Sequence, residues 1–559
     1  MTIMAGRQAI MEIFRAEGVD HIFGNPGTTE LGFMDILQDY PDIRYIVCLH
    51  ESIALGAAQM YANASGKTGV VNLHVAPGLG NALGALYNAA IGKMPLIVTA
   101  GQQDTRMVVR EPVLSYDLVA MAKPLAKWSV QLQHVDEIPT IFHRAFKVAQ
   151  DPPRGPVFIA LPGNVIDEEA DLHLVNPSVS FRKNRPDPEG VQAAAALLAK
   201  AQRPAMICGD GVQAAQAQDE LVHMAELLGA NVWNTLITGA LGFPNMHPQF
   251  RGALPGEHSA IRQTFNDTDV VLAVGVDLFD EVFYSEGPAL PEGCALVQID
   301  NSSWEIGKNM PADIGLLADP KLALQEVAEV VVPQMDNAAQ QAAAQRREAM
   351  QAQKEQERAR QKQRAERGWD SVPIAPPRLF ATLSECLPEN VVIYNEAITA
   401  ETDMTRTVPL EQNRLFGNHG GGIGQGLPGA IGVKLANPGR PVVAVVGDGS
   451  AMYTIQSLWS AARHNIPVIY VILSNRSYRV LKFNMNRYRR QLDIPSGRPY
   501  PFMDFDDPPL DFVRIAQGMG VASQRVTQPG DIEAAVKAAL AANAPYLLEV
   551  VTEGRVPAQ

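Results

Sequence analysis

The sequence has 559 residues, of which 47% are hydrophobic and 19% are charged, and its formal net charge is −14. A chain of this length is too long to fold around one hydrophobic core, so about three or four domains are expected. The composition excludes a disordered chain. The acidic balance argues against a general nucleic-acid-binding protein, which needs a basic surface to replace counterions. An anionic small substrate stays open, because a local arginine cluster can act inside an acidic whole.

The chain opens on a pattern that predicts an amphipathic helix rather than a signal peptide, and no apolar run reaches the ~20 residues that span a bilayer. We therefore expect a cytoplasmic protein that binds no membrane. The four cysteines have no CxxC spacing, which favours free thiols over a zinc site or disulfides. They are Cys48, Cys208, Cys294 and Cys386.

Short apolar runs rich in β-forming residues alternate with helical patterns, which is typical of parallel sheets covered by helices on both faces. The first block of runs holds 45–49, 70–74, 96–100 and 157–161; the second 205–209, 270–275 and 295–299; the third 391–394, 442–446, 468–473 and 546–551. We predict an α/β fold of three doubly wound parallel-sheet domains. The first and third could share a topology, although no sequence repeat is evident.

Two segments have the composition of linkers between these blocks. Residues 181–190 mix charge, proline and glycine as linkers do, and 336–368 indicate a solvated charged helix. The predicted domains are 1–180, 190–335 and 376–559, with 336–375 as a helical linker. Between Arg346 and Arg367 there are eight basic and four acidic residues. A charged surface helix is the preferred interpretation, and contact with a polyanion is the alternative.

The most specific motif is GDGS at 447–450, with Asn475 following 27 positions after Asp448. Both residues follow very apolar strands, so we expect their side chains at one edge of one sheet. Carboxylate, amide and main-chain oxygens are the ligands that Mg²⁺ prefers, together with phosphate oxygens. Gly447 and Gly449 let the backbone approach a diphosphate closely, and a helix beginning near Ser450 would direct its N–H groups at the phosphates.

A GDG followed at this spacing by an asparagine resembles the cofactor motif of thiamine-diphosphate-dependent enzymes. The resemblance implies thiamine diphosphate and Mg²⁺ as cofactors, a pyrimidine-binding first domain, a middle domain and a diphosphate-binding third domain. It implies Asp448, Asn475 and the carbonyl of Ser477 as metal ligands, and Ser450, Tyr453 and Tyr478 near the diphosphate.

That cofactor sets a second requirement, a carboxylic acid that hydrogen-bonds the far nitrogen of its aminopyrimidine ring and makes the amino group basic. The segment YIVCLHES provides Glu51 at the end of a buried strand. By itself a glutamate at a strand end is more often a structural cap, but the match to the family pattern favours catalysis.

Much of the chain resembles the benzoylformate decarboxylases. The shared stretches are FGNPGTTE (23–30), YIVCLHE (45–51), NLHVAPGLGNALGALYNA (72–89), LIVTAGQQ (96–103), GQGLPGAIGVKLA (424–436) and GDGSAMYTIQSLWSAARHNIP (447–467). In that family one subunit gives the glutamate and another the metal motif. A homodimer or homotetramer with sites at the subunit interface is therefore implied.

The resemblance assigns further residues. His74 matches the family's N-terminal active-site histidine, which relays protons, and Thr28 stands where a hydroxyl positions the substrate carboxylate. Ile423 matches the bulky aliphatic residue that bends the cofactor. The Gly421 carbonyl would accept a hydrogen bond from the amino group of the cofactor. Asn25, Pro26, Asn81 and Gln103 lie in matching loops.

Two features depart from that family. Its second histidine, from the middle domain, falls at or near Val282, where no histidine stands. His419 is a candidate substitute, or equally a loop residue that only forms hydrogen bonds. The segment 476–493, which we call the lid, carries an unusual basic cluster: Arg479, Lys482, Arg487, Arg489 and Arg490. These cations either steer an anionic or coenzyme-A-linked substrate or form a solvated helix face.

The preferred function is the non-oxidative decarboxylation of a 2-oxo acid to an aldehyde, by way of ylide and enamine intermediates. The alternative is carboligation or acyl transfer, as in enzymes that resemble acetolactate synthase or oxalyl-coenzyme A decarboxylase. A cofactor-binding paralogue without turnover is disfavoured, because Glu51, Asp448 and Asn475 occur together. The absent histidine and the polar lid predict a smaller or more polar substrate than benzoylformate.

Overall fold

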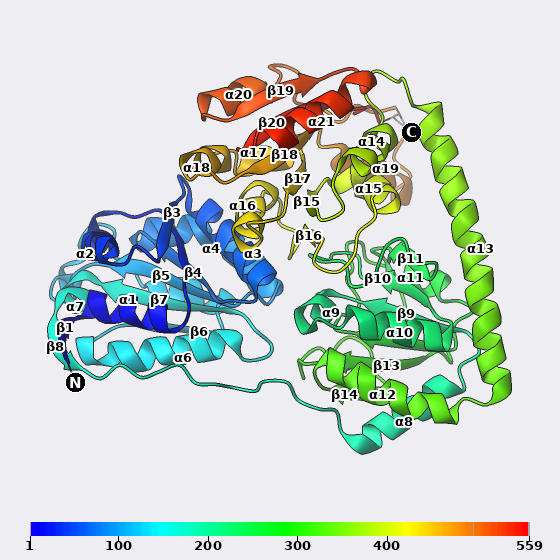
Figure 1. Cartoon of the computed structure of the whole chain (residues 1–559), viewed down its shortest axis with the longest axis horizontal. Helices are drawn as coiled ribbons and strands as arrows, with labels where there is room; N and C mark the ends of the chain where they lie inside the picture. The colour runs from blue at the N-terminus through cyan, green and yellow to red at the C-terminus, as the bar shows by residue number, and fades with distance from the viewer. Residues whose placement is uncertain (1, 496, 557–559) are drawn as a thin grey trace.

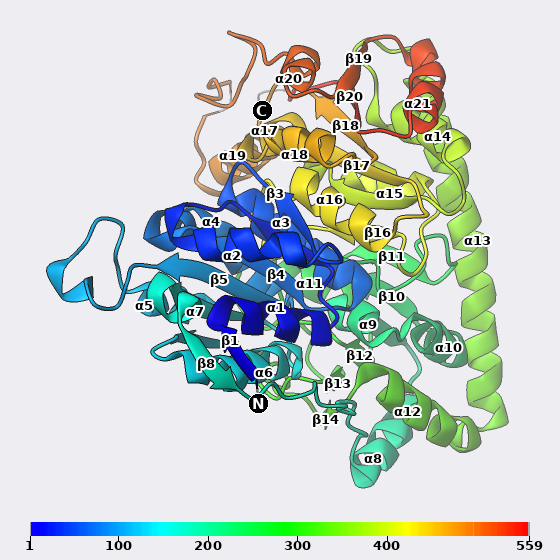
Figure 2. The same cartoon turned by 60° about the vertical axis from the view of Figure 1, so that its left-hand side comes forward.

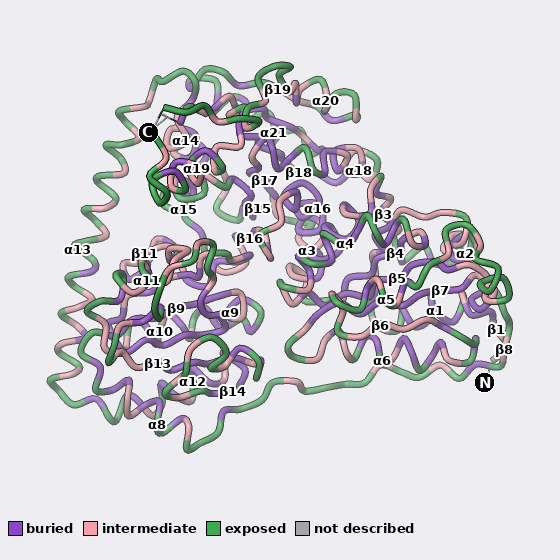
Figure 3. Tube along the Cα trace, turned by 180° about the vertical axis from the view of Figure 1, so that it is seen from behind, coloured by how far each residue is buried: buried purple, intermediate pink, exposed green. Residues whose placement is uncertain are grey.

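The computed structural model describes residues 2–495 and 497–556, and it contains three six-stranded parallel sheets, each in a domain of its own (Figure 1). The predicted fold class is therefore confirmed. Figure 3 shows the sheets buried beneath helices and loops that face outward.

The first sheet has the strand order β3-β2-β4-β5-β7-β6. Its central strands β4, β5 and β7 are buried along their whole length, as expected where helices cover both faces. The strands are β2 (His21–Gly24), β3 (Arg44–Val47), β4 (Gly69–Leu73), β5 (Leu96–Gln102), β6 (Trp128–Gln131) and β7 (Pro156–Pro162). The helices are α1 (Gly6–Ala16), α2 (Leu31–Ile36), α3 (Glu51–Ser65), α4 (Val75–Ile91), α5 (Leu118–Ala122), α6 (Ile138–Gln150) and α7 (Gly163–Asp167). A separate antiparallel pair joins β1 (Thr2–Ala5) to β8 (Glu169–Leu172).

The middle sheet has the order β11-β10-β9-β12-β13-β14. Numbered within the domain this is 3-2-1-4-5-6, the order of a doubly wound sheet whose connections reverse beside its first strand. The strands are β9 (Pro204–Cys208), β10 (Asn231–Asn234), β11 (Phe250–Ala253), β12 (Val270–Val274), β13 (Ala295–Asp300) and β14 (Ile314–Leu317). The helices are α8 (Pro188–Ala199), α9 (Asp210–Ala215), α10 (Gln218–Leu228), α11 (His258–Thr264) and α12 (Pro320–Gln334).

The third sheet has the order β16-β15-β17-β18-β20-β19. Numbered within their domains, the first and third sheets both read 2-1-3-4-6-5, so the suggested shared topology is confirmed. The strands are β15 (Val392–Glu396), β16 (Leu415–Gly417), β17 (Val442–Gly447), β18 (Val468–Ser474), β19 (Ala522–Val526) and β20 (Tyr546–Val551). The helices are α14 (Pro376–Cys386), α15 (Glu401–Thr407), α16 (Gly426–Ala436), α17 (Asp448–Tyr453), α18 (Ser457–Arg463), α19 (Arg479–Gln491), α20 (Phe512–Gly518) and α21 (Ile532–Ala541).

The predicted charged helix is confirmed as α13 (Asn337–Arg367), which runs along the outside of the molecule from the middle domain to the third (Figures 1 and 3). Only Ala343 and Met350 of this helix are buried. Among the described residues, no helix is both long enough and apolar enough to cross a membrane. The four cysteines are free.

The first and third domains pack against each other through α3 and α16. A side-chain carbon at Gly432 would lie 2.0 Å from the carbonyl oxygen of Ala57, so glycine is required for this close helix contact. On the opposite side of the first domain, the loop between β5 and α5 projects away from the body of the molecule (Figure 2).

Candidate active site

Glu51 is the first residue of α3, directly after the turn that follows β3, and it is buried with 6% of its surface exposed. The two oxygens of its carboxylate accept hydrogen bonds from two side-chain amides. Asn25 Nδ2 donates to Oε1 at 3.1 Å, and Asn81 Nδ2 donates to Oε2 at 3.0 Å. The carboxylate is thus fixed between the loop that follows β2 and the second turn of α4.

His74 caps the N-terminus of α4, and its ring orientation is set by a residue that sequence reasoning missed. Nδ1 of His74 lies 2.8 Å from Oε2 of Glu30, a side chain that is buried within the first domain. Glu30 also accepts hydrogen bonds from the Gly27 N–H and the Thr29 hydroxyl. A buried carboxylate on Nδ1 leaves Nε2 as the nitrogen free to exchange protons. No local pattern signals this contact, because Glu30 and His74 lie 44 positions apart in the sequence.

Thr28 lies in the same turn and is exposed, whereas the neighbouring Thr29 contacts His74 Nδ1 at 3.3 Å. Pro26 is half-buried in the loop after β2. Gln103 donates from Nε2 to the Val113 carbonyl at 2.8 Å, and so anchors the projecting loop.

In the third domain, Asp448 begins α17 at the end of β17, two residues earlier than the expected helix start, and is buried. Its carboxylate accepts the Gly449 N–H at 2.8 Å and the Arg476 N–H at 2.5 Å. Burial raises the pKa of Asp448 to about 6, although these N–H donors oppose the shift. The Asn475 amide oxygen accepts the Ser477 N–H at 3.0 Å, so both polar groups meet in the turn after β18.

This donor set fits a hard cation and a diphosphate. Asp448, the Asn475 amide and the Ser477 carbonyl offer only oxygen atoms, and carboxylate and amide oxygens keep lone pairs beyond those they already use. The Ser477 hydroxyl is buried without a hydrogen-bond partner among the described residues. Around Gly447 a side-chain carbon would meet nothing closer than 3.9 Å, which leaves room for a bound group. No cluster of three His, Cys, Asp or Glu side chains that suits a metal occurs in the described part of the chain.

Two tyrosines flank this turn. Tyr478 lies near Tyr453, which is 58% exposed, and packs edge-on against Phe505 with ring centroids 4.5 Å apart. A side-chain carbon at Gly449 would lie 2.5 Å from the Tyr478 ring, so this position requires glycine. Ser450 is buried in the first turn of α17.

Glu396, at the end of β15, is a second buried carboxylate that sequence reasoning missed. It accepts the main-chain N–H groups of Gly424 at 2.7 Å and Gly426 at 2.6 Å, and the Asn418 amide at 2.7 Å. Burial raises the pKa of Glu396, opposed by these hydrogen bonds. Glu396 therefore fixes the ends of the loop 418–426, which carries Gly421 and Ile423.

Backbone strain marks the same strand ends. Val75 follows His74 with φ +42°, Arg476 follows Asn475 with φ +56°, and Ile398 lies two residues after Glu396 with φ +52°. Left-handed backbone at non-glycine residues costs about 1–3 kcal/mol each and gathers at functional sites.

Within one chain, Glu51 and the loop of Gly421 are kept apart. Asn63 Nδ2 lies 3.4 Å from His419 Nε2 at one end of this loop, and Asn63 is twelve residues beyond Glu51 on α3. At 1.5 Å per residue that separation is about 18 Å along the helix. A side-chain carbon at Gly422 would lie 2.6 Å from Asn88 Oδ1, near the far end of α4.

His419 is buried where the three domains meet. Its Nδ1 lies 2.9 Å from Oδ2 of Asp210 in the middle domain, and Asn63 of the first domain approaches Nε2. Burial would raise the pKa of Asp210, but His419, the Thr238 hydroxyl and the Gly239 N–H together outweigh it, and the pKa lies below its ordinary value. These contacts support the interpretation of His419 as a hydrogen-bonding residue, since both ring nitrogens have partners.

The basic cluster of the lid is largely bound within the protein. Lys482 pairs with Asp504, Arg487 pairs with Glu257, and Arg489 donates to the carbonyls of Arg498 and Pro499. The guanidinium of Arg487 also lies 3.9 Å from the ring centroid of Phe283. The lid helix α19 is therefore docked on the loops around 257 and 283 of the middle domain.

Val282, where the second family histidine was expected, is 54% exposed and donates its N–H to Gly256 at 3.1 Å. This contact brings a different histidine beside it. His258 begins α11, and its Nε2 lies 3.7 Å from Oε2 of Glu281. Sequence reasoning missed His258, because it lies 24 positions before Val282 and only the folded loops bring them together.

Three parts of the sequence match the domains of one family. Residues 4–121 match the N-terminal TPP binding domain of thiamine pyrophosphate enzymes, 191–327 their central domain, and 399–550 their C-terminal TPP binding domain. Thiamine pyrophosphate is another name for thiamine diphosphate.

Relatives align along the whole chain. Benzoylformate decarboxylase of Pseudomonas aeruginosa is 34% identical over 551 residues, 98% of each chain. A probable acetolactate synthase large subunit of Methanocaldococcus jannaschii is 31% identical over an alignment of 590 residues, 98% of this chain and 92% of that one. The thiamine diphosphate-dependent 4-hydroxybenzoylformate decarboxylase of Rhodococcus jostii RHA1 superposes with a TM-score of 0.86 at 30% identity, covering 99% of this chain and 100% of that chain.

Proposed function

Because the chain belongs to the thiamine pyrophosphate enzyme family, we propose that it decarboxylates a 2-oxo acid to an aldehyde with thiamine diphosphate and Mg²⁺ as cofactors. One pairing carries this proposal. A buried carboxylate fixed by two amides stands at the strand ends of the first domain, and a set of oxygen ligands stands at those of the third.

When bound, thiamine diphosphate supplies a carbon nucleophile for the substrate carbonyl and accepts the electron pair that departing carbon dioxide leaves. Glu51 would hydrogen-bond the far ring nitrogen of the aminopyrimidine, and Asn25 and Asn81 fix its carboxylate in a buried position for that contact. His74, oriented by Glu30, moves protons near the reacting carbonyl. Asp448, Asn475 and the Ser477 carbonyl hold the metal, and the first turn of α17 offers N–H groups to the diphosphate.

We propose an aryl 2-oxo acid of the benzoylformate type as the substrate. This departs from the sequence-based expectation of a smaller or more polar acid. Lys482, Arg487 and Arg489 have partners within the protein, so the lid gives little reason for an anionic side chain. The relatives named for benzoylformate and 4-hydroxybenzoylformate decarboxylation align over nearly the whole chain.

The test is carbon dioxide release from a panel of 2-oxo acids, with and without thiamine diphosphate and Mg²⁺. The panel contains benzoylformate, pyruvate, a dicarboxylic 2-oxo acid and oxalyl-coenzyme A. We expect benzoylformate to give the highest kcat/KM, with benzaldehyde as product. Absence of release from every acid would overturn the proposed reaction, and a lead by the dicarboxylic acid or the thioester would overturn the substrate class.

Carboligation is the second candidate, and the acetolactate synthase relatives favour it. It differs in product rather than in the first step, because two pyruvate molecules then yield acetolactate instead of acetaldehyde. Product analysis of the pyruvate reaction decides between them.

We further propose a homodimer or homotetramer whose sites need two chains, since α3 holds Glu51 and the Gly421 loop of its own chain apart. An exposed face of α4 suits the contact between copies: Tyr87 and Ile91 are 43% and 48% exposed, and a side-chain carbon at Gly84 would meet nothing within 4 Å. The projecting loop adds exposed Val109 and Val113. Apolar patches of this kind mark interfaces.

Co-expression of two inactive variants tests the shared site. A hybrid of one Glu51→Gln chain and one Asp448→Ala chain has one intact site if each site takes Glu51 from one chain and Asp448 from the other. Random pairing then restores about one quarter of wild-type activity. Sites built within single chains would stay inactive in every combination.

A further inference from the structure

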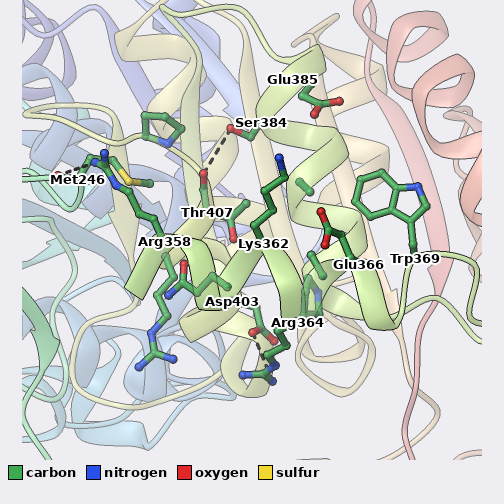
Figure 4. Close-up of a pocket in the computed structure, with 16 residues that line it drawn as sticks. Met246, Arg358, Lys362, Arg364, Glu366, Trp369, Ser384, Glu385, Asp403 and Thr407 are labelled. Atoms are coloured by element: carbon green, nitrogen blue, oxygen red, sulfur yellow. Dashed lines mark hydrogen bonds and ion pairs between the residues drawn. The ribbon is translucent and has the colours of Figure 1, made fainter. Parts of the chain in front are cut away.

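A cavity outside the proposed active site lies between the long helix α13 and the helices α14 and α15 (Figure 4). Its volume is about 930 Å³, at the upper end of the ~300–1,000 Å³ typical of small-molecule sites. None of the residues predicted to bind thiamine diphosphate or the metal lines it. The cavity therefore has no role in the reaction proposed above.

One side of the cavity is cationic. Arg358 and Lys362 lie one turn apart on α13, and Arg406 comes from α15. Lys362 and Arg406 form no ion pair or hydrogen bond among the described residues, whereas Arg364 approaches Asp403 at 3.6 Å. Arg358 uses one nitrogen on the Met246 carbonyl at 2.8 Å, which aims its guanidinium and leaves its other N–H groups available.

The other side is aromatic and acidic. Trp369 lines the wall, and the Arg378 guanidinium lies 3.6 Å from its ring centroid, which holds the indole in place. Figure 4 shows Glu366, Glu385 and Trp369 toward one end of the cavity, Arg358 toward the other, and Lys362 between them. Neither glutamate forms an ion pair among the described residues.

We propose that this cavity binds a nucleoside polyphosphate. Free guanidinium and ammonium groups on converging helices recognise phosphate, a rigid indole recognises a planar base, and carboxylates accept the amino group of such a base. A simple inorganic anion would leave the aromatic and acidic end without contacts. The proposed reaction does not use the basic residues of α13. Under this proposal Arg358 and Lys362 bind the phosphates of the nucleotide.

Calorimetric titration of the holoenzyme tests the site. Saturation with thiamine diphosphate and Mg²⁺ blocks the diphosphate half of the active site, so that ATP can report on the cavity alone. We expect ATP to bind, and tripolyphosphate to bind at least about 10-fold more weakly because it lacks a base for Trp369. No heat with ATP, or equal affinity for the two anions, would overturn the proposal.

A matched pair of charge reversals on α13 adds specificity. Lys362→Glu is expected to weaken ATP binding at least about 10-fold. Arg360→Glu makes the same charge change on an exposed residue that does not line the cavity, and should change the affinity less than about threefold. Equal losses in both variants would mean that ATP responds only to the general charge of the helix, which contradicts a site. Binding is read directly, so a failure here leaves the proposed decarboxylation untouched, and the reverse also holds.

Discussion

The first and third domains share one topology but carry different chemistry at equivalent strand ends. In each sheet the third strand of the domain is followed by a helix whose start bears a polar residue: His74 after β4 and Asp448 after β17. Under the proposed function, the first sheet supplies groups that hold and move protons, and the third supplies oxygen ligands for a metal. The shared backbone topology therefore does not determine the chemistry of either domain. The side chains at the carboxyl ends of the strands determine it.

The largest expected effect belongs to the first domain. Glu51→Gln removes the acidic proton while keeping the shape of the side chain, so kcat should fall about 10³-fold with thiamine diphosphate affinity nearly unchanged. Steady-state kinetics and calorimetry with the cofactor measure the two quantities. Glu168→Gln is the matched control, because Glu168 is an exposed acid of the same domain. Near-wild-type turnover in Glu51→Gln would assign the catalytic carboxylate elsewhere.

The next effect belongs to the third domain and is one of binding. Asp448→Ala removes the only charged ligand of the proposed metal set, so Mg²⁺-dependent cofactor affinity should fall about 100-fold or more. Calorimetry with and without a chelator checks this. If Glu51→Gln and Asp448→Ala instead both lost cofactor affinity and turnover together, the division between proton chemistry in the first domain and metal binding in the third would be wrong.

A smaller effect is expected from Glu30, which touches His74 rather than the substrate. Glu30→Gln leaves the ring less firmly oriented and removes a negative neighbour, so kcat should fall about 10-fold, as when an orienting partner is lost. The pH dependence of kcat should also shift, whereas a purely structural defect would lower activity equally at every pH. Glu30→Asp, which restores the charge, should recover part of the rate.

The last expected effect is one of stability and belongs to the middle domain, which carries none of the proposed cofactor residues. Burial raises the pKa of Asp300 to about 6, with Lys93 opposing the shift. The folded protein therefore binds more protons than the unfolded chain between about pH 4 and pH 6, and the free energy of unfolding falls as pH rises across that window. Above pH 6 the cost stays constant at about 3 kcal/mol.

Asp300→Asn mimics the neutral acid, so it should stabilise the protein more at pH 8 than at pH 5. Thermal unfolding at both pH values measures this, with the exposed Asp267→Asn as control. A substitution that destabilises the protein at pH 8 would mean that the ionised carboxylate is needed near Lys93.

Much of the fold was predictable because the central strands are buried on both faces and read as apolar runs. All eleven predicted runs coincide with strands. The strands that were missed are mostly edge strands such as β6, β14 and β19, which are partly exposed and therefore less apolar. The motif around Asp448 and Asn475 was readable for a related reason, since each residue directly follows a strong central strand.

The sequence by itself determined the number of sheets, the fold class and the local motifs, because these depend on side chains close together in the chain. Only the tertiary structure decided which distant side chains contact one another. It placed Glu30 on His74, joined His419 to Asp210 and neutralised Arg487 with Glu257. It also separated Glu51 from the Gly421 loop by most of the length of α3. Such contacts join residues tens or hundreds of positions apart, and no local pattern encodes which of many distant groups will pack together when the domains close.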